Sequence, residues 1–350
     1  MKPIIDLHLH LDGSLPLNAV DLLLSIYPGA VPEAFKPLLD LGEEERKARL
    51  MQELQAPATC NSLQEYLQRF DLPVSLLQTP FAMSLAVGSL LNELKEEGVR
   101  YAEIRFAPQL HSPAWSEKAR LMREREIMEA MLETASRVSG IKANFILCCM
   151  RNLPDRHKLG YDPNRNTLRL AEEFLGSGVV AVDLAGAEAR DATSEFRKLF
   201  EMAKEMKLPF TIHAGEAGSR DWRMESLRSA IEFGAKRIGH GIALEHSPEL
   251  RAICKERGIG IECCPVSNLQ TKGVCGGIKN HPLPMFLEEG LLVSVNTDNR
   301  TVSNTTLQKE FEVLSEVGIG EAEQKQLTLN AIESSFADDA TKEWLKKMLI

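Results

Sequence analysis

The chain has 350 residues, of which 44% are hydrophobic and 26% are charged, and its formal net charge is −9. This composition is typical of a folded globular protein and excludes general disorder. The acidic balance, without a basic stripe interleaved with aromatic side chains, excludes nucleic acid as the main partner.

The first apolar run begins at residue 4, and no later run approaches about 18 uninterrupted apolar residues. We therefore expect neither an export signal nor a membrane span, and we predict a cytoplasmic protein. The seven cysteines follow no disulfide or structural zinc spacing. The adjacent pairs Cys148–Cys149 and Cys263–Cys264 lie in apolar runs, where thiols behave as small hydrophobic side chains.

The first predicted strand carries two histidines. Its sequence, with the residues that follow it, is Ile4-Ile5-Asp6-Leu7-His8-Leu9-His10-Leu11-Asp12-Gly13-Ser14. Successive side chains of a strand point to opposite faces, so His8, His10 and Asp12 are expected to share one face. The leucines between them are expected to pack on the other face.

Residues 16–72 are predicted to be helical, with helices over 17–26, 43–54 and 63–70. Because no strand interrupts this segment, it is an insertion between the first strand and the helix that packs on that strand. We predict that it is a lid over the end of the strand, and the alternative is helical packing without such a role.

From residue 73 onward, predicted helices and strands alternate, with glycine and proline between them. The predicted helices cover residues 73–97, 116–139, 166–175, 194–206, 222–233, 248–257 and 282–289. The predicted strands cover residues 99–107, 141–150, 179–184, 208–213, 237–239, 259–263 and 291–296. Residues 306–350 are predicted to form helices that close the molecule.

With the first strand, this pattern contains eight strands separated by helices, which implies parallel pairing. It predicts one α/β domain over residues 1–350, a (β/α)8 TIM barrel of a metal-dependent hydrolase with a helical insertion after the first strand. An open doubly wound sheet is the alternative. Such a sheet would not gather strands one, five, six and eight around one point.

Polar residues follow several of these strands, at the end where barrel enzymes build their sites. His213 ends the fifth strand, His240 follows the sixth and Asp298 follows the eighth. His8 and His10 lie on the first strand. Two histidines on one strand, with one more histidine and one aspartate, are a sufficient ligand set for a catalytic zinc ion whose coordination is completed by water.

Six motifs, in order along nearly the whole chain, resemble those of the adenosine deaminases of the amidohydrolase superfamily. They are Asp6-Leu7-His8-Leu9-His10-Leu11-Asp12-Gly13-Ser14, Asp183-Leu184-Ala185-Gly186, His213-Ala214-Gly215-Glu216, Gly239-His240-Gly241, Cys264-Pro265-Val266-Ser267-Asn268 and Asn296-Thr297-Asp298. Each motif alone is weakly specific, whereas six in family order are highly specific.

The resemblance implies one zinc ion per chain, held by His8, His10, His213 and Asp298. Zinc lowers the pKa of a bound water from about 15.7 toward about 7, which supplies a nucleophile for C6 of a purine. The implied reaction is the hydrolytic deamination of adenosine, and of 2′-deoxyadenosine, to inosine or 2′-deoxyinosine and ammonia in purine salvage. The expected partner is therefore a small-molecule purine nucleoside, and no oligomeric state is predicted.

The resemblance also implies two catalytic residues. Glu216 resembles the family's proton donor to purine N1, and a carboxylic acid must keep its proton at neutral pH to fill this role. His240, between two glycines, resembles the residue that orients the attacking water and takes its proton. Without the resemblance, the glutamate would be interpreted as a helix-dipole contact and the histidine as a packed core residue.

Three further positions resemble substrate-binding residues. Gly186 resembles the backbone donor to purine N3, and Asp12, with His10 nearby, resembles the group that faces the ribose 5′-hydroxyl. Asn299 departs from the pattern, because many family members carry a second aspartate there, near purine N7. An amide NH2 donates at any pH, whereas a carboxyl group must be protonated to donate. We therefore hypothesise that Asn299 keeps the contact with N7.

The four other histidines, His111, His157, His246 and His281, are predicted to be surface or structural residues. Each lies in a polar or proline-containing loop context. His111 follows a predicted strand, so its loop could border the pocket.

Three alternative functions remain open from sequence. The first is a deaminase that acts on adenine or another 6-aminopurine nucleoside. The second is a two-metal amidohydrolase that cleaves a ring amide or a phosphoester. Such sites usually need a bridging lysine or glutamate on the fourth strand, where this chain offers only Asp183. The third is an inactive barrel that binds nucleosides, although the expected ligands, Glu216 and His240 are all present.

Overall fold

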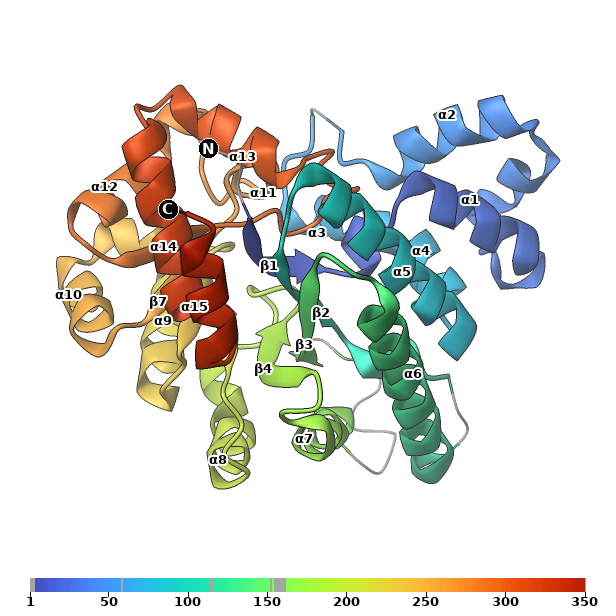
Figure 1. The fold of residues 1–350 in the computed structure, drawn as a ribbon, viewed down its shortest axis with the longest axis horizontal. Helices are drawn as coiled ribbons and strands as arrows, with labels where there is room; N and C mark the ends of the chain where they lie inside the picture. The colour runs from blue at the N-terminus through green and yellow to red at the C-terminus, as the bar shows by residue number, and fades with distance from the viewer. Residues whose placement is uncertain (1–3, 58, 114–115, 152, 154–161, 350) are drawn as a thin grey trace.

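The structure, a computed structural model, places eight parallel strands around a common centre, with helices outside them (Figure 1). The described residues are 4–57, 59–113, 116–151, 153 and 162–349, and His157 lies outside them. The strands are β1 Ile5–His10, β2 Tyr101–Phe106, β3 Lys142–Met150, β4 Val179–Ala185, β5 Thr211–Ala214, β6 Arg237–His240, β7 Gly260–Cys263 and β8 Leu292–Val295.

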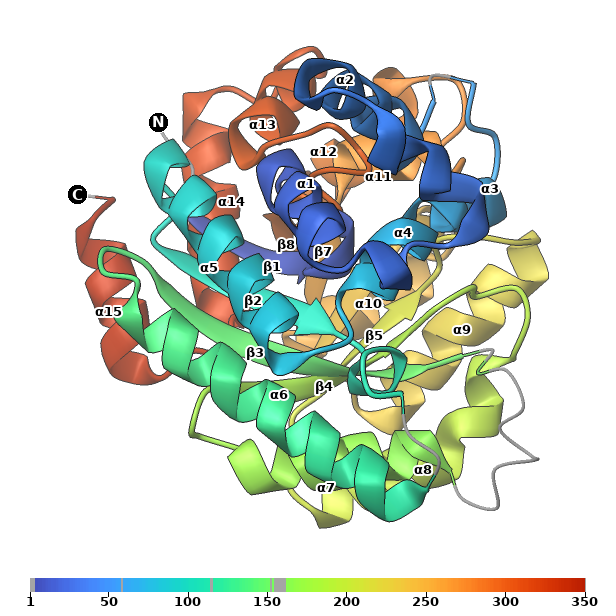
Figure 2. The same cartoon turned by 90° about the vertical axis from the view of Figure 1, so that its right-hand side faces the viewer.

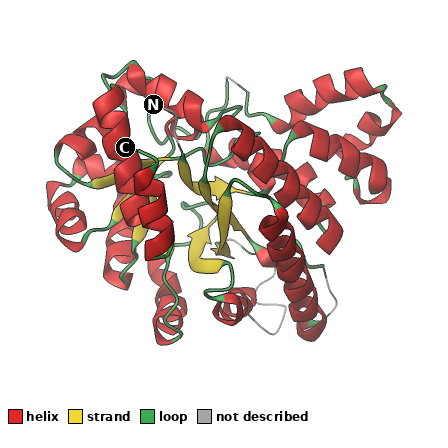
Figure 3. Cartoon of the chain, in the orientation of Figure 1, coloured by secondary structure: helices red, strands yellow, loops and turns green. Residues whose placement is uncertain are grey.

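Helices surround the central strands from all sides (Figure 3). They are α1 Leu17–Ile26, α2 Glu43–Leu54, α3 Leu63–Leu67, α4 Asp71–Leu76, α5 Pro80–Glu97, α6 Glu117–Arg137, α7 Pro163–Phe174, α8 Arg197–Glu205, α9 Arg220–Phe233, α10 Pro248–Arg257, α11 Pro265–Gln270, α12 Leu283–Glu288, α13 Leu307–Ser315, α14 Glu321–Ser334 and α15 Asp339–Lys347. None of the helices in the described ranges has the length and hydropathy that a membrane span requires.

The strands pair in parallel as two four-stranded sheets, β1-β2-β3-β4 and β5-β6-β7-β8. Single parallel bridges join the two sheets at both edges: Val182 of β4 pairs with Phe210 before β5, and Leu9 of β1 pairs with Asp298 beyond β8. At the second edge, the backbone N of Asp298 donates to the backbone O of His8 over 2.7 Å. This arrangement confirms the predicted α/β fold of the TIM-barrel type.

The single helix predicted over residues 73–97 is wrong, because the structure has two helices there, α4 and α5. Thr79 caps α5: its Oγ1 accepts a hydrogen bond from the backbone N of Ala82 over 3.1 Å. Pro80, the first residue of α5, has no backbone N–H with which to continue α4. The break leaves Leu77 outside both helices.

The first strand also ends earlier than the alternation of side chains predicted. Leu11 has the backbone angles of a helix, with φ −61° and ψ −50°, and a 3₁₀ turn, η1 Asp12–Ser14, follows it. Because the chain leaves the sheet at this turn, the strand face predicted for Asp12 is wrong. In the turn, a Cβ at Gly13 would lie 2.0 Å from Asn299 Oδ1, so the residue at this position must be glycine.

The helical segment of residues 16–72 projects beyond the strands to the right in Figure 1 and faces the viewer in Figure 2. Two hydrogen bonds attach it to the loop after β8. The backbone N of Ala56 donates to the backbone O of Val302 over 2.8 Å. The hydroxyl groups of Tyr66 and Ser303 lie 2.7 Å apart. The segment therefore packs against the end of the barrel that carries the loops after the strands.

Apolar side chains fill the space between strands and helices, and buried charges lie inside the ring. Arg237 donates from Nη1 to Glu103 Oε2 over 2.6 Å and from Nε to Glu262 Oε1 over 2.5 Å. Arg105 Nη2 donates to Glu262 Oε2 over 2.9 Å. All four side chains are completely buried. Because an unpaired buried charge is costly, each of these groups depends on its partners.

Replacing Arg237 with leucine should leave Glu103 and Glu262 buried without a main partner. We expect the free energy of unfolding, measured by urea denaturation, to fall by about 3–5 kcal/mol. Arg197→Leu is the matched control, because Arg197 pairs with Glu232 on the exposed surface over 2.9 Å and exposed pairs contribute little. Equally small changes in both variants would contradict the structural importance of the buried charges.

Candidate active site

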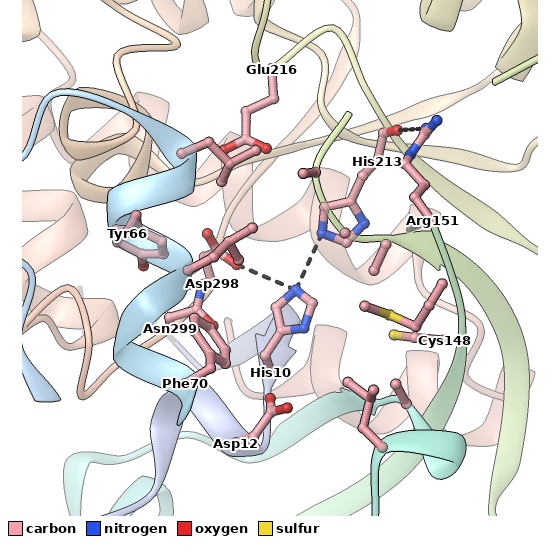
Figure 4. Close-up of a pocket in the computed structure, with 18 of the residues that line it drawn as sticks. His10, Asp12, Tyr66, Phe70, Cys148, Arg151, His213, Glu216, Asp298 and Asn299 are labelled. Carbon is pink, nitrogen blue, oxygen red and sulfur yellow. Dashed lines mark hydrogen bonds and ion pairs between the residues drawn. The ribbon is translucent and has the colours of Figure 1, made fainter. Parts of the chain in front are cut away.

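A cavity of about 280 Å³ opens at the carboxyl ends of the strands. Its wall includes most of the site residues expected from the sequence, namely His10, Asp12, Gly186, His213, Glu216, His240, Asp298 and Asn299. The insertion and the start of α4 supply an apolar side of the wall, formed by Leu63, Tyr66, Leu67, Phe70 and Val74. In Figure 4, Tyr66 and Phe70 lie on one side of the cavity, and Cys148 and Arg151 lie on the other.

Four side chains from separate parts of the chain converge at the base of this cavity. Ligand atoms of His8, His10, His213 and Asp298 all lie within 4.8 Å of one another. His10 Nε2 lies 3.2 Å from His213 Nε2 and 3.4 Å from Asp298 Oδ1 (Figure 4). His8 Nε2 lies 3.4 Å from the same oxygen. The structure thus brings together the four residues that the sequence predicted as metal ligands.

Buried carboxylates orient two of these histidines. His8 Nδ1 donates to Glu262 Oε2 over 2.7 Å, and His213 Nδ1 lies 2.9 Å from Asp183 Oδ2. Both contacts are made at Nδ1, so Nε2 of each ring is directed toward the cluster. Burial lowers the pKa of His10 to about 3, so this ring is neutral at pH 7.

Asp298 supplies a negative charge to the cluster. Burial opposes this charge, but the contact with His8, whose Nε2 lies 3.4 Å from Oδ1, holds the pKa of Asp298 well below its ordinary value. Ser267 Oγ donates to Asp298 Oδ2 over 2.5 Å. The backbone φ of Asp298 is +60°, a conformation that costs about 1–3 kcal/mol in residues other than glycine and that clusters at functional sites.

Three imidazole nitrogens and one carboxylate oxygen form a ligand set suited to a divalent transition metal. His8 Nε2 is buried and has no hydrogen-bond partner among the described side chains and backbone. Nε2 of His10 and Nε2 of His213 also lie 3.2 Å apart. These atoms could coordinate a cation placed between them, so the residues fit a metal ion.

Two observations weigh against a two-metal site. On β4, Asp183 Oδ2 already accepts a hydrogen bond from Arg105 Nη1 over 3.0 Å and lies beside His213. In a second group of potential ligands, the ligand atoms of His240, Cys264 and Asp298 lie within 4.8 Å of one another. However, burial raises the pKa of the Cys264 thiol well above its ordinary value, and the thiolate is the form that binds metals.

Glu216 lies in the turn after β5, and a buried carboxylate holds this turn in place. Glu188 accepts hydrogen bonds from the backbone N of Gly215 (2.6 Å), Glu216 (2.8 Å) and Ala217 (2.9 Å). Burial, followed by the negative charge of Asp298, raises the pKa of Glu216 to about 8. Glu216 is therefore mainly a protonated acid at pH 7.

A chain of hydrogen bonds determines which ring nitrogen of His240 is protonated. The backbone N of Leu283 donates to His281 Nδ1 over 3.1 Å, so His281 carries its proton on Nε2, which lies 3.2 Å from Asn268 Oδ1. The backbone N of Cys264 also donates to Asn268 Oδ1. Asn268 must therefore direct its NH2 group to His240 Nδ1, 3.0 Å away. In the neutral ring the proton of His240 lies on Nε2.

The Nε2–H group of His240 faces Glu216 Oε2, 3.5 Å away. Burial lowers the pKa of His240 well below its ordinary value, so the ring is neutral. Its backbone φ is +63°, again in the left-handed region. The carboxylic acid and the imidazole therefore stand side by side next to the ligand cluster.

The substrate-binding residues expected from the resemblance also reach the cavity. Gly186 has φ +96°, and a Cβ there would lie 3.3 Å from the backbone O of Arg151. Asp12 is nearly buried in the 3₁₀ turn, and Asn299 Oδ1 is buried without a partner in the described ranges. All three residues line the cavity.

Three residues that contact this site were assigned no role from the sequence. Glu188 stands in no motif, and Asn268 belongs to a motif in which it was given no role. His111 was predicted to be a surface or structural residue, in a loop that could border the pocket. His111 is completely buried, and its Nε2 lies 3.7 Å from Asp12 Oδ2. His281 was predicted to be a surface or structural residue, and it is buried.

The family of the chain follows from comparisons with known proteins. A family model described as adenosine deaminase matches residues 3–350. The chain belongs to the adenosine deaminase family. This confirms the resemblance drawn from the six motifs.

Curated relatives of this family member are similar over nearly their full length. An adenosine deaminase of Haemophilus ducreyi is 42% identical, over 98% of this chain and 94% of the relative. An adenosine deaminase of Clostridium perfringens is 38% identical, over 99% of this chain and 98% of the relative. The crystal structure of an adenine deaminase from Arthrobacter aurescens has a TM-score of 0.78 and 25% identity, over 100% of this chain and 98% of that chain.

Metal analysis of the purified family member should find about one divalent transition-metal ion per chain, because one set of ligands converges. His213→Gln should lower the metal content, measured by inductively coupled plasma mass spectrometry. His246→Gln is the matched control, because His246 is exposed and pairs with Glu245. Two ions per chain would favour the two-metal alternative.

Proposed function

We propose that this protein is a zinc-dependent hydrolytic deaminase of purine salvage in the cytoplasm. It converts adenosine and 2′-deoxyadenosine to inosine and 2′-deoxyinosine and releases ammonia. The observation that carries the proposal is the position of a protonated, buried Glu216 beside a four-residue metal ligand set in one cavity. The names of the full-length relatives support the choice of adenosine.

His8, His10, His213 and Asp298 would hold one zinc ion per chain. Zinc, when bound, lowers the pKa of a coordinated water toward about 7. Glu262 and Asp183 orient the rings of His8 and His213, and burial keeps the ring of His10 neutral.

Glu216 supplies a proton to the purine. Attack of water on C6 moves electron density to N1, and protonation of N1 stabilises the tetrahedral carbon. With a pKa raised to about 8, Glu216 has a proton to donate at neutral pH. The hydrogen bonds that Glu188 accepts from the backbone of the turn keep Glu216 in place during this step.

His240 orients the attacking water. The resemblance implied that it orients the water and also takes a proton from it. Because Asn268 places the proton of the neutral ring on Nε2, His240 presents an N–H donor to the cavity. This tautomer directly supports the orienting role.

The remaining site residues hold the nucleoside. The backbone N of Gly186 would donate to purine N3, and the amide of Asn299 would donate to N7. Asp12, with His10 nearby, would face the ribose 5′-hydroxyl. All four residues line the same cavity.

The segment of residues 16–72 acts as a lid in this proposal. Leu63, Leu67 and Phe70 place apolar side chains over the cavity, opposite the strand ends. Closure by these side chains would exclude bulk water, which strengthens the electrostatic interactions inside the site.

The first test measures the ultraviolet absorbance of adenosine, adenine and N6-methyladenosine with purified enzyme, with and without a chelator. We expect chelator-sensitive conversion of adenosine to inosine, restored by added zinc, and no reaction of adenine. Conversion of adenine or N6-methyladenosine in preference to adenosine would overturn the proposed substrate. No conversion of any compound by metal-loaded protein would overturn the proposed enzyme activity.

Glu216→Gln should lower kcat for adenosine by about 10²–10⁴-fold, because the amide cannot supply the proton to N1. KM should change much less, since the amide is similar in shape. Glu245→Gln, at a half-buried position outside the cavity wall, is the matched control and should retain activity. Metal content is measured in both variants. A Glu216→Gln enzyme with full metal content and nearly full kcat would contradict this role.

A further inference from the structure

His111 lies in the loop after β2, completely buried and outside the cavity wall. Its Nδ1 lies 3.0 Å from the backbone O of Leu77. A carbonyl oxygen only accepts hydrogen bonds, so Nδ1 must carry a proton. This contact exists because the break between α4 and α5 leaves Leu77 outside both helices.

The other ring nitrogen of His111 faces a carboxylate. Nε2 lies 3.7 Å from Asp12 Oδ2 and has no hydrogen-bond partner in the described parts of the chain. The ring is thus fixed at Nδ1 by the backbone of Leu77 and directs its Nε2 at the carboxylate of Asp12.

Asp12 is held from two sides in this arrangement. Its Oδ1 accepts a hydrogen bond from the backbone N of Gly13 over 3.1 Å, and its Oδ2 faces His111. The carboxylate lines the cavity, near His10 (Figure 4). The side chain therefore has little freedom to turn, and its remaining lone pairs are available to a hydroxyl group in the cavity.

We propose that His111 is a positioning residue that holds the carboxylate of Asp12 toward the ribose 5′-hydroxyl and so sets the preference for nucleosides that carry this hydroxyl. The inference rests on the proposed function, because it assumes that Asp12 contacts the ribose. His111 itself touches neither the substrate nor the residues of the ligand cluster.

The contact also links ribose recognition to the helices that cover the cavity. Leu77 follows α4, and Val74 of α4 lines the cavity. Gln78 Nε2 donates to the backbone O of Leu110, next to His111, over 2.9 Å. The loop that supports Asp12 is thus attached to the segment that follows the insertion, so the position of α4 influences the position of the carboxylate.

The test compares kcat/KM for adenosine and for 5′-deoxyadenosine, which lacks the hydroxyl. The enzymes are the metal-loaded wild type, His111→Gln, Asp12→Asn and the double variant. Glutamine is uncharged and cannot make both contacts of the ring. His246→Gln, which changes an exposed histidine outside the cavity, is the matched control.

We expect the wild type to prefer adenosine, and His111→Gln to lower this preference about tenfold, as expected for loss of one polar contact that holds the Asp12 carboxylate. In the Asp12→Asn background the same change should lower the preference no further, because the two residues act through one contact. His246→Gln should keep the wild-type preference.

Two results would overturn the inference. Equal losses on both substrates in His111→Gln would show that the histidine is only structural. Additive losses in the double variant would show that it does not act through Asp12. A wild-type enzyme that converts neither nucleoside would instead overturn the proposed function, and the inference with it.

Discussion

The structure depends on one buried carboxylate. Glu262 of β7 accepts hydrogen bonds from His8 of β1, Arg105 of β2, Arg237 of β6 and Thr211 of β5. These donors come from both four-stranded sheets, so the carboxylate ties the two halves of the barrel together. It also accepts a hydrogen bond from Nδ1 of His8 and thereby directs Nε2 toward the ligand cluster. The barrel and the site therefore depend on the same contacts, since a buried charge is tolerated only when its partners are in place.

Buried polar groups also hold the other residues of the site in place. Several functional side chains are held by a second group: Asp183 lies beside His213, Asn268 bonds to His240, and Glu188 holds the turn that carries Glu216. At His240, the backbone N–H groups of Leu283 and Cys264, which can only donate, determine the direction of the bonds. The cavity consequently presents the neutral ring of His240 next to a protonated carboxylic acid, which fits the acid catalysis proposed for purine deamination.

The sequence predicted most elements of the fold because each has a local physical cause. Apolar runs separated by glycine and proline marked the strands and helices, and the helix predicted over residues 248–257 coincides with α10. The errors arose where local signals were ambiguous. Periodicity continued through residues 73–97, although Thr79 and Pro80 divide that segment, and alternation continued to Asp12, although the strand had ended at His10.

The sequence by itself determined the fold class, the family and the identities of the residues expected to do chemistry. These follow from periodicity, from motif order and from the ligand properties of histidine and carboxylate side chains, which need no coordinates. Only the tertiary structure decided which groups stand behind those residues. The roles of Glu188, Asn268 and His111 could not be read from the sequence, because they depend on groups that lie 28 to 99 residues away along the chain. These groups are the backbone of the turn at Glu216, the ring of His240 and the carboxylate of Asp12. Protonation states were decided in the same way, because the pKa and the tautomer of a side chain depend on burial and on neighbours that only folding brings together.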